Sequence, residues 1–147
     1  MTAFRFPLQK VLDWRRTQLE LEEIRFKQQL AALADLDRAR QELQTAAGKA
    51  EAQVRDWIPL TGGDLAALGS FRLDLKQKDR DIAARRVQCQ QSLETQQGVM
   101  LEARRRSRLL ERLKDRRQAE WQAARDHELD ELASESFLAK RAGSRQP

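Results

Sequence analysis

The chain has 147 residues, of which 35% are charged and 40% are apolar, with only 6 glycines and 3 prolines. This composition excludes a compact globule with many turns and is typical of long helices or a coiled coil. The apolar fraction is also too large for a wholly disordered chain, because it offers enough surface to offset the loss of chain entropy.

Cysteine usage and hydropathy indicate where the protein resides. Cys89 is the one cysteine, which excludes an internal disulfide framework and a zinc site made of several cysteines. No run approaches the roughly 18–20 apolar residues that span a bilayer, and the N-terminus lacks the apolar core of a signal peptide. We therefore expect a cytoplasmic protein without a membrane span of its own.

The first part of the chain predicts one long helix over about residues 6–57. Pro7 suits the first turn of a helix, and only Gly48 weakens the helical pattern before Trp57. Apolar residues recur at spacings of three, four and seven, as expected of a helix with one apolar seam. They are Leu12, Leu19, Phe26, Leu30, Leu33, Leu36, Leu43, Ala47, Ala50, Val54 and Trp57.

The strongest break in the helical pattern lies at about residues 58–64. Pro59 removes a backbone donor, and Gly62-Gly63 removes the restraint on φ, so the first helix should end here. Asp64 is the expected N-cap of the next helix. Gly69-Ser70 offers an alternative start, which would extend the hinge to residue 70.

The second helix is expected over about residues 65–139, followed by a disordered tail at 140–147. One position of its seam repeats every seven residues, with Gln96 as a polar interruption. The companion position is apolar in part only, which predicts a seam of moderate stability. The two sets are Leu75, Ile82, Cys89, Gln96, Ala103 and Leu110, and Asp79, Arg86, Leu93, Met100, Ser107, Lys114 and Trp121.

These elements predict an all-α fold, a long antiparallel two-helix coiled coil (α-hairpin) that forms a single domain over residues 1–147. Counting outward from the break, the numbers of facing residues add to about 120, so Leu8 lies opposite about residue 112. About 25 residues at the C-terminal end then have no partner in the chain, and an unpacked helix is marginal in water. The alternative is pairing between two chains as a dimer of straight helices.

Charge is concentrated near the predicted meeting point of the termini. Residues 102–117 contain eight basic and three acidic residues, a net +5 that equals the formal charge of the whole chain. Such a stretch has three interpretations: a solvated helix face, a phosphate-binding patch for nucleic acid, or a docking surface for an acidic protein. Docking suits the unpaired helix best, because Trp121 beside arginines is typical of interface anchors.

Catalytic signals are weak throughout the sequence. His127 is expected to be a solvated helical residue, and Cys89 a small packing residue on the seam. No glycine-rich phosphate loop, zinc spacing or serine–histidine–acid set is present. We therefore expect a protein that is not an enzyme and that carries no cofactor or metal.

Two terminal segments resemble the FliJ family, the small coiled-coil component of the flagellar type III export apparatus. The family opens with an aromatic-basic-aromatic-x-Leu, x-x-Val-Leu, x-x-Arg pattern, which is similar to residues 4–15 here, with Pro7 as a departure from it. It closes with a Leu-Glu-x-Leu-Lys-x-Arg-Arg run, an aromatic residue and an acidic stretch. Here these are residues 110–117, Trp121 and residues 127–133.

The resemblance implies a non-catalytic stalk and adaptor similar to the central stalk of rotary ATPases. Its paired termini would insert into the flagellar export ATPase hexamer and promote its assembly and activity. Other parts would contact the export-gate membrane protein and export chaperones, so that membrane association is peripheral, at the cytoplasmic face and through partners only. The alternatives are the equivalent stalk of a virulence type III secretion system and a basic nucleic-acid-binding coiled coil, although no nucleic acid is expected.

The resemblance and the charge pattern together select candidate binding residues. The weaker candidates, for the export gate, are Trp57 and Phe71. The candidates for binding the ATPase are Phe4, Arg5, Phe6, Leu8, Arg15, Arg112, Leu113, Arg116, Arg117 and Trp121.

Overall fold

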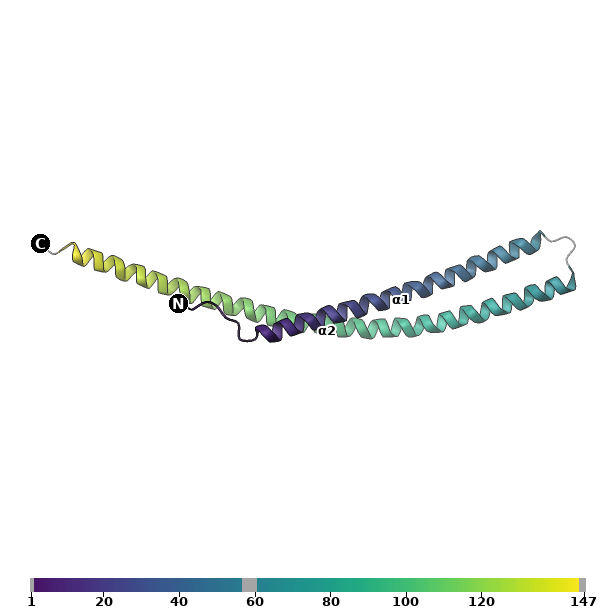
Figure 1. Cartoon of the computed structure of the whole chain (residues 1–147), viewed down its shortest axis with the longest axis horizontal. Helices are drawn as coiled ribbons and strands as arrows, with labels where there is room; N and C mark the ends of the chain where they lie inside the picture. Colours follow the sequence, from purple (N-terminus) through teal and green to yellow (C-terminus); the bar gives the residue numbers. More distant parts are fainter. Residues whose placement is uncertain (1, 57–60, 146–147) are drawn as a thin grey trace. The chain divides into compact units, whose positions relative to one another are not determined.

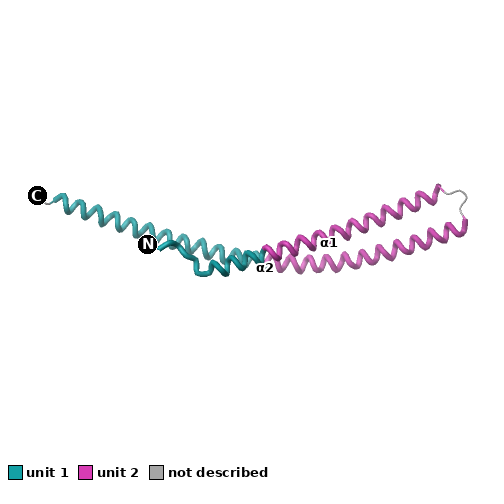
Figure 2. Tube along the Cα trace, in the orientation of Figure 1, with its two compact units in different colours: residues 1–19, 102–147 teal, residues 20–101 magenta. Residues whose placement is uncertain are grey.

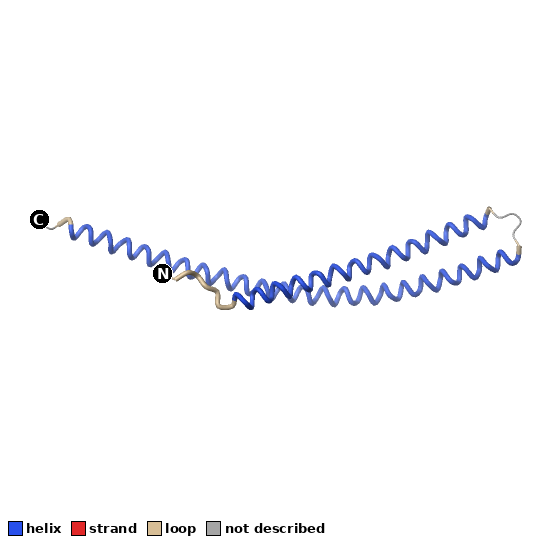
Figure 3. The backbone as a smooth tube through the Cα atoms, viewed as in Figure 1, coloured by secondary structure: helices blue, strands red, loops and turns tan. Residues whose placement is uncertain are grey.

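The computed structural model describes residues 2–56 and 61–145, and it places them in two long helices (Figure 1). Helix α1 spans Gln9–Arg55 and helix α2 spans Gly62–Gly143. No strand occurs among the described residues (Figure 3). The helices pack against each other in opposite directions, so the prediction of an all-α antiparallel hairpin is confirmed.

Helix α1 begins later than the sequence analysis predicted. A turn at residues 6–9 precedes it, where the Gln9 N–H donates to the Phe6 carbonyl at 3.1 Å. Pro7 disfavours the helical conformation at the residue before it, so residues 2–6 stay outside the helix. We call residues 2–8 the N-terminal strap. At its other end α1 stops at Arg55, and Trp57 and Pro59 lie outside the described residues.

Helix α2 begins at Gly62, and the predicted N-cap at Asp64 is wrong. The N-cap is Thr61, whose Oγ1 accepts a hydrogen bond from the Asp64 N–H at 3.2 Å. In return, the Asp64 carboxylate accepts one from the Thr61 N–H at 3.1 Å. This reciprocal pair is a capping box, with Asp64 at its third helical position. Gly69 and Ser70 lie inside the helix, so the alternative start there is also wrong.

The end of α2 also differs from the prediction. The helix runs to Gly143, so residues 140–143, which the sequence analysis assigned to a disordered tail, are helical. The Ser144 N–H donates to the Lys140 carbonyl at 3.0 Å, and its hydroxyl donates to the Arg141 carbonyl at 2.9 Å. These bonds use carbonyls that the last turn of a helix otherwise leaves without partners.

The chain divides into two compact units, each containing part of both helices (Figure 2). Unit 1 comprises residues 1–19 and 102–147, and unit 2 comprises residues 20–101. The single coiled-coil domain therefore stays a prediction, and each unit is described by itself.

The seam positions predicted for α2 are the positions that the hairpin covers. From Leu75 to Trp121, every member of the two predicted heptad sets is buried or half-buried. The fully covered core is nevertheless thin. Among the described residues, the buried side chains are those of Leu12, Phe6 and Ser107 in unit 1, and of Met100 and Glu22 in unit 2.

Ion pairs between the helices of unit 2 report the register. Arg40 Nε lies 2.9 Å from Asp79, and Arg86 Nε lies 2.6 Å from Asp37, so the partners' numbers add to 119 and 123. Both values agree with the predicted sum of about 120. Each pair joins α1 to α2, which fixes how the two helices align along this unit.

A polar layer interrupts the seam of unit 2 at Gln96. Its amide donates to the Glu22 carboxylate and, at 3.2 Å, to the Glu22 carbonyl. Arg25 supplies a second donor to the same carboxylate at 2.9 Å. Glu22 is buried, so these donors offset the cost of removing a charge from water. Nearby, the Cys89 thiol faces the Gln29 carbonyl at 3.7 Å, which agrees with its predicted place on the seam.

Candidate docking site

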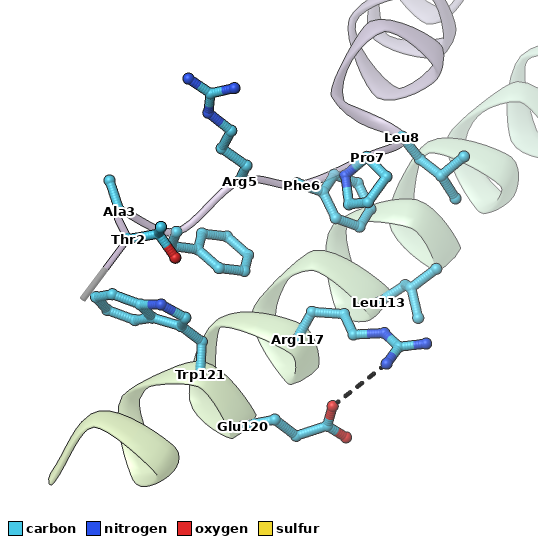
Figure 4. A pocket seen from close by; sticks show the side chains of 11 residues that line it. Thr2, Ala3, Arg5, Phe6, Pro7, Leu8, Leu113, Arg117, Glu120 and Trp121 are labelled. Atoms are coloured by element: carbon cyan, nitrogen blue, oxygen red, sulfur yellow. Dashed lines mark ion pairs between the residues drawn. The ribbon is translucent and has the colours of Figure 1, made fainter. Parts of the chain in front are cut away.

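The candidate site lies in unit 1, where the N-terminal strap runs along α2 (Figure 4). Between the strap and the helix is an open hollow of about 1190 Å³. Its strap side is formed by residues 2–8, and its α2 side by residues one helical turn apart. These α2 residues are Leu113, Arg117, Glu120 and Trp121.

Aromatic and proline residues hold the strap against α2. The ring of Phe4 lies 6.0 Å from that of Trp121, with the two planes tilted by 52°. This arrangement is one that aromatic quadrupoles favour. Phe6 is buried, and Pro7 fixes the backbone between Phe6 and the start of α1. The strap is therefore anchored by apolar contacts rather than by a helix.

The charged groups around the hollow are mostly open to solvent. Glu120 pairs with Arg117 at 3.6 Å and with Arg116 at 3.8 Å, so one carboxylate serves two guanidinium groups. Arg116 and Arg117 remain 79% and 62% exposed in their side chains. The side chain of Arg5 points away from α2 in Figure 4. These cations are available to a partner, because exposed pairs of this kind are weak.

Two cation–π contacts occur among the described residues of unit 1. The guanidinium of Arg125 lies 5.4 Å from the ring centre of Trp121, and that of Arg15 lies 4.8 Å from Trp14. Trp121 thus contacts an aromatic ring and an arginine, a composition typical of binding hot spots.

The paired part of unit 1, residues 2–19 and 102–121, is strongly basic. It contains twelve basic and five acidic residues, a net charge of +7. One inter-helix ion pair offsets part of this charge, because Arg16 Nε lies 3.2 Å from Glu111. The remaining excess favours an acidic partner over a neutral one.

The structure brings most of the predicted ATPase-binding residues together. Three of the candidates do not line the hollow, although they belong to unit 1: Arg15, Arg112 and Arg116. Those that line it come from both ends of the chain. They are Phe4, Arg5, Phe6, Leu8, Leu113, Arg117 and Trp121.

The predicted export-gate residues lie elsewhere. Phe71 belongs to unit 2, is 38% exposed, and lines a second hollow of about 300 Å³ with Leu68, Val54 and Ala50. Trp57 lies outside the described residues.

Sequence reasoning missed two residues of the site. Glu120 restrains Arg116 and Arg117, and Arg125 stacks on Trp121. The spacings were available as a signal, since Arg116 and Glu120, and Trp121 and Arg125, are four residues apart on one helix.

The described residues contain no group of three or more His, Cys, Asp or Glu side chains that could hold a metal ion. Neither helix, within the described ranges, has a stretch long and apolar enough to cross a membrane. No family model, curated protein or solved structure matches the chain. The likeness to the FliJ family accordingly depends on the two terminal motifs.

Proposed function

We propose that the protein is a non-catalytic stalk and adaptor of the bacterial flagellar type III export apparatus. In this proposal the paired termini insert into the ring of the export ATPase and promote its assembly and activity. The chain also links the ring to the export gate and to export chaperones. It acts in the cytoplasm, at the membrane face, through these partners.

The observation that carries the proposal is that the two family-like motifs, over 90 residues apart, form one surface. Phe4, Phe6 and Leu8 of the opening motif line the same hollow as Leu113 and Arg117 of the closing one.

The chemistry of this surface suits a ring lined by acidic and apolar groups. The +7 charge of the paired part of unit 1 attracts acidic loops. Trp121 and the strap then offer apolar and aromatic contacts that exclude water, which is where binding energy concentrates. Phe71, in the separate hollow of unit 2, is the corresponding candidate for the export gate.

The test is to add the purified protein to the purified export ATPase and to measure hexamer formation and ATP hydrolysis. We expect stimulation by the wild-type chain and a loss of at least about tenfold in its potency for Arg116→Glu/Arg117→Glu. Arg80→Glu/Arg85→Glu is the matched control, because it makes the same charge change on exposed residues of α2 in unit 2.

Two results would overturn the proposal. If the wild-type chain changes neither the assembly nor the ATP hydrolysis of the ATPase, the proposed function is wrong. If the wild type and the Arg116→Glu/Arg117→Glu variant stimulate the ATPase equally, the proposed binding site is wrong.

A further inference from the structure

The C-terminal part of α2 extends past the strap, and no other described part of unit 1 packs on it (Figure 2). We call residues 122–143 the extension, and every side chain in it is exposed. Its large apolar side chains are all exposed, Leu129 by 49%, Leu132 by 61%, Phe137 by 64% and Leu138 by 60%. Leu129 neighbours Leu132 three residues along and Ala133 four residues along, and Ala133 neighbours Phe137 in turn, so these residues form a broad apolar stripe.

Acidic residues accompany this stripe. Residues 126–135 contain Asp126, Glu128, Asp130, Glu131 and Glu135 and no lysine or arginine, a net charge of −5 with His127 neutral. The intrahelical contacts of the segment are those of Gln122 with Asp126 and of His127 with Glu131, and neither brings a lysine or arginine to it. A surface that covers the extension should be both apolar and basic.

The paired part of unit 1 has such a surface on its outside. Leu8, Val11, Trp14 and Leu109 are 39%, 43%, 54% and 55% exposed. The first three are three residues apart on or beside the first turns of α1, so each neighbours the next. Exposed basic residues lie on the same two helices, with Lys10 next to Val11 and Arg105, Arg108 and Arg112 within four residues of Leu109.

The extension cannot reach this surface within its own chain. Residues 102–143 belong to one unbroken helix, in which each residue advances about 1.5 Å, so residues 126–135 lead away from residues 105–114. A second copy of the chain can supply the contact, because an antiparallel neighbour reverses the direction.

We propose that two copies of the chain form a symmetric dimer in which the extension of each lies on the basic, apolar outside of the other's unit 1. A two-fold axis near residue 120 sets residues 126–135 of one copy against residues 105–114 of the other. The second segment contains five basic residues and one acidic residue, a net +4 against −5. This dimer does not rest on the proposed function, and it needs no other protein.

Symmetry makes the two contacts cooperative. In a two-fold interface each contact occurs twice. Both extensions therefore pack on the partner at once, and two contacts that are each of marginal stability form together. Charge attraction orients the copies and weakens as salt increases, whereas the apolar stripe persists. The dimer should therefore be favoured by high protein concentration and by low ionic strength.

The test is sedimentation velocity of the full chain over a range of concentrations, at low and high salt. We expect the mass to rise from 17.1 kDa toward twice that value with concentration, and the transition to move to higher concentration in high salt. A chain ending at residue 124 should stay monomeric throughout. Circular dichroism confirms that each variant remains helical.

Charge reversals make the test specific to the two faces. Glu128→Lys/Glu131→Lys on the extension and Arg105→Glu/Arg108→Glu on unit 1 should each weaken the dimer, because they change the charges of each contact from −5 against +4 to −1 against +4 and to −5 against 0. An equimolar mixture of these two variants should dimerise at a lower concentration than either variant alone, because one contact of the mixed dimer keeps −5 against +4. Arg80→Glu/Arg85→Glu is the control that should dimerise as the wild type does.

The proposal is overturned if the wild type is monomeric at every concentration and salt. It is equally overturned if the chain ending at residue 124 still dimerises, or if the mixed variants dimerise no better than either variant alone.

Discussion

At the scale of single residues, the hairpin depends on a few covered side chains. Leu12 is 0% exposed and Ser107 is 2% exposed, and both belong to unit 1. Most other large apolar side chains of this chain are partly open to water. The burial of Leu12 therefore contributes more to the stability of unit 1 than any side chain of similar size on its surface.

We predict that Leu12→Ala lowers the free energy of unfolding by about 2–5 kcal/mol, because it removes buried methyl groups and leaves a cavity. Leu73→Ala is the matched control, since Leu73 is 69% exposed on α2. It removes the same atoms and should change stability by no more than about 0.5 kcal/mol. Urea unfolding followed by circular dichroism measures both. Equal effects of the two substitutions would contradict the burial of Leu12.

Asp64 gives the start of α2 a dependence on pH. The backbone N–H of Thr61 and then its hydroxyl lower the pKa of Asp64 below its ordinary value of 3.8. A carboxyl whose folded-state pKa is lowered stabilises the fold above its unfolded-state pKa, and this stabilisation disappears as the pH falls through the folded-state pKa.

We therefore predict that Asp64→Ala lowers the melting temperature and that the difference from the wild type is largest and constant above about pH 4. Below that pH the difference should become progressively smaller. Melting curves of the wild type and the variant from pH 2 to pH 6 measure the difference. Thr61→Ala should cost about 1 kcal/mol through loss of the N-cap. A gap between wild type and Asp64→Ala that is constant across this range would contradict the capping box.

At the scale of elements, heptad spacing predicted the seam well, because in a two-helix coiled coil the residues that repeat every seven positions face the partner helix and are covered by it. It placed Cys89, Gln96 and Met100 on the covered side of α2, where the structure has them. The predicted register sets Gln96 opposite about residue 24, but spacing could not predict which polar side chain of that turn binds it, because this depends on the side-chain direction of Glu22.

We predict that Gln96→Ala costs about 1–3 kcal/mol, because it takes a hydrogen-bond donor from the buried Glu22 carboxylate. The double variant Glu22→Leu/Gln96→Leu should recover this stability, since it removes the polar pair together. Gln97→Ala, at an exposed neighbouring position, is the control. Chemical unfolding of the four proteins measures the effect, and a neutral Gln96→Ala would contradict the role of the layer.

Helix ends were harder to predict than the seam. Aspartate is a common N-cap, which favours Asp64 in that role. The reciprocal hydrogen bonds with Thr61 make Thr61 the N-cap instead, so α2 begins earlier in the chain, at Gly62. Likewise, Gly69 and Ser70 are weak helix formers that the surrounding helix accommodates. Local propensity favours several starts, and the hydrogen bonds that select one of them are not visible in composition.

At the scale of the whole molecule, the hairpin explains why residues from both ends of the chain share a surface. The register alone predicted that Leu8 meets residues near 112, and Leu8 and Leu113 line one hollow. The contact of Phe4 with Trp121 could not be predicted from periodicity, because the strap is not helical and its path depends on Pro7.

In the proposed function, the surface around Trp121 is where the protein docks on the export ATPase. The most direct test replaces Trp121 by a photo-cross-linking amino acid in one sample and Phe71, in unit 2, in another. After irradiation with the ATPase hexamer, we predict a covalent adduct to the ATPase from position 121 and little from position 71. Adducts of equal yield, or an adduct from position 71 alone, would contradict the claim.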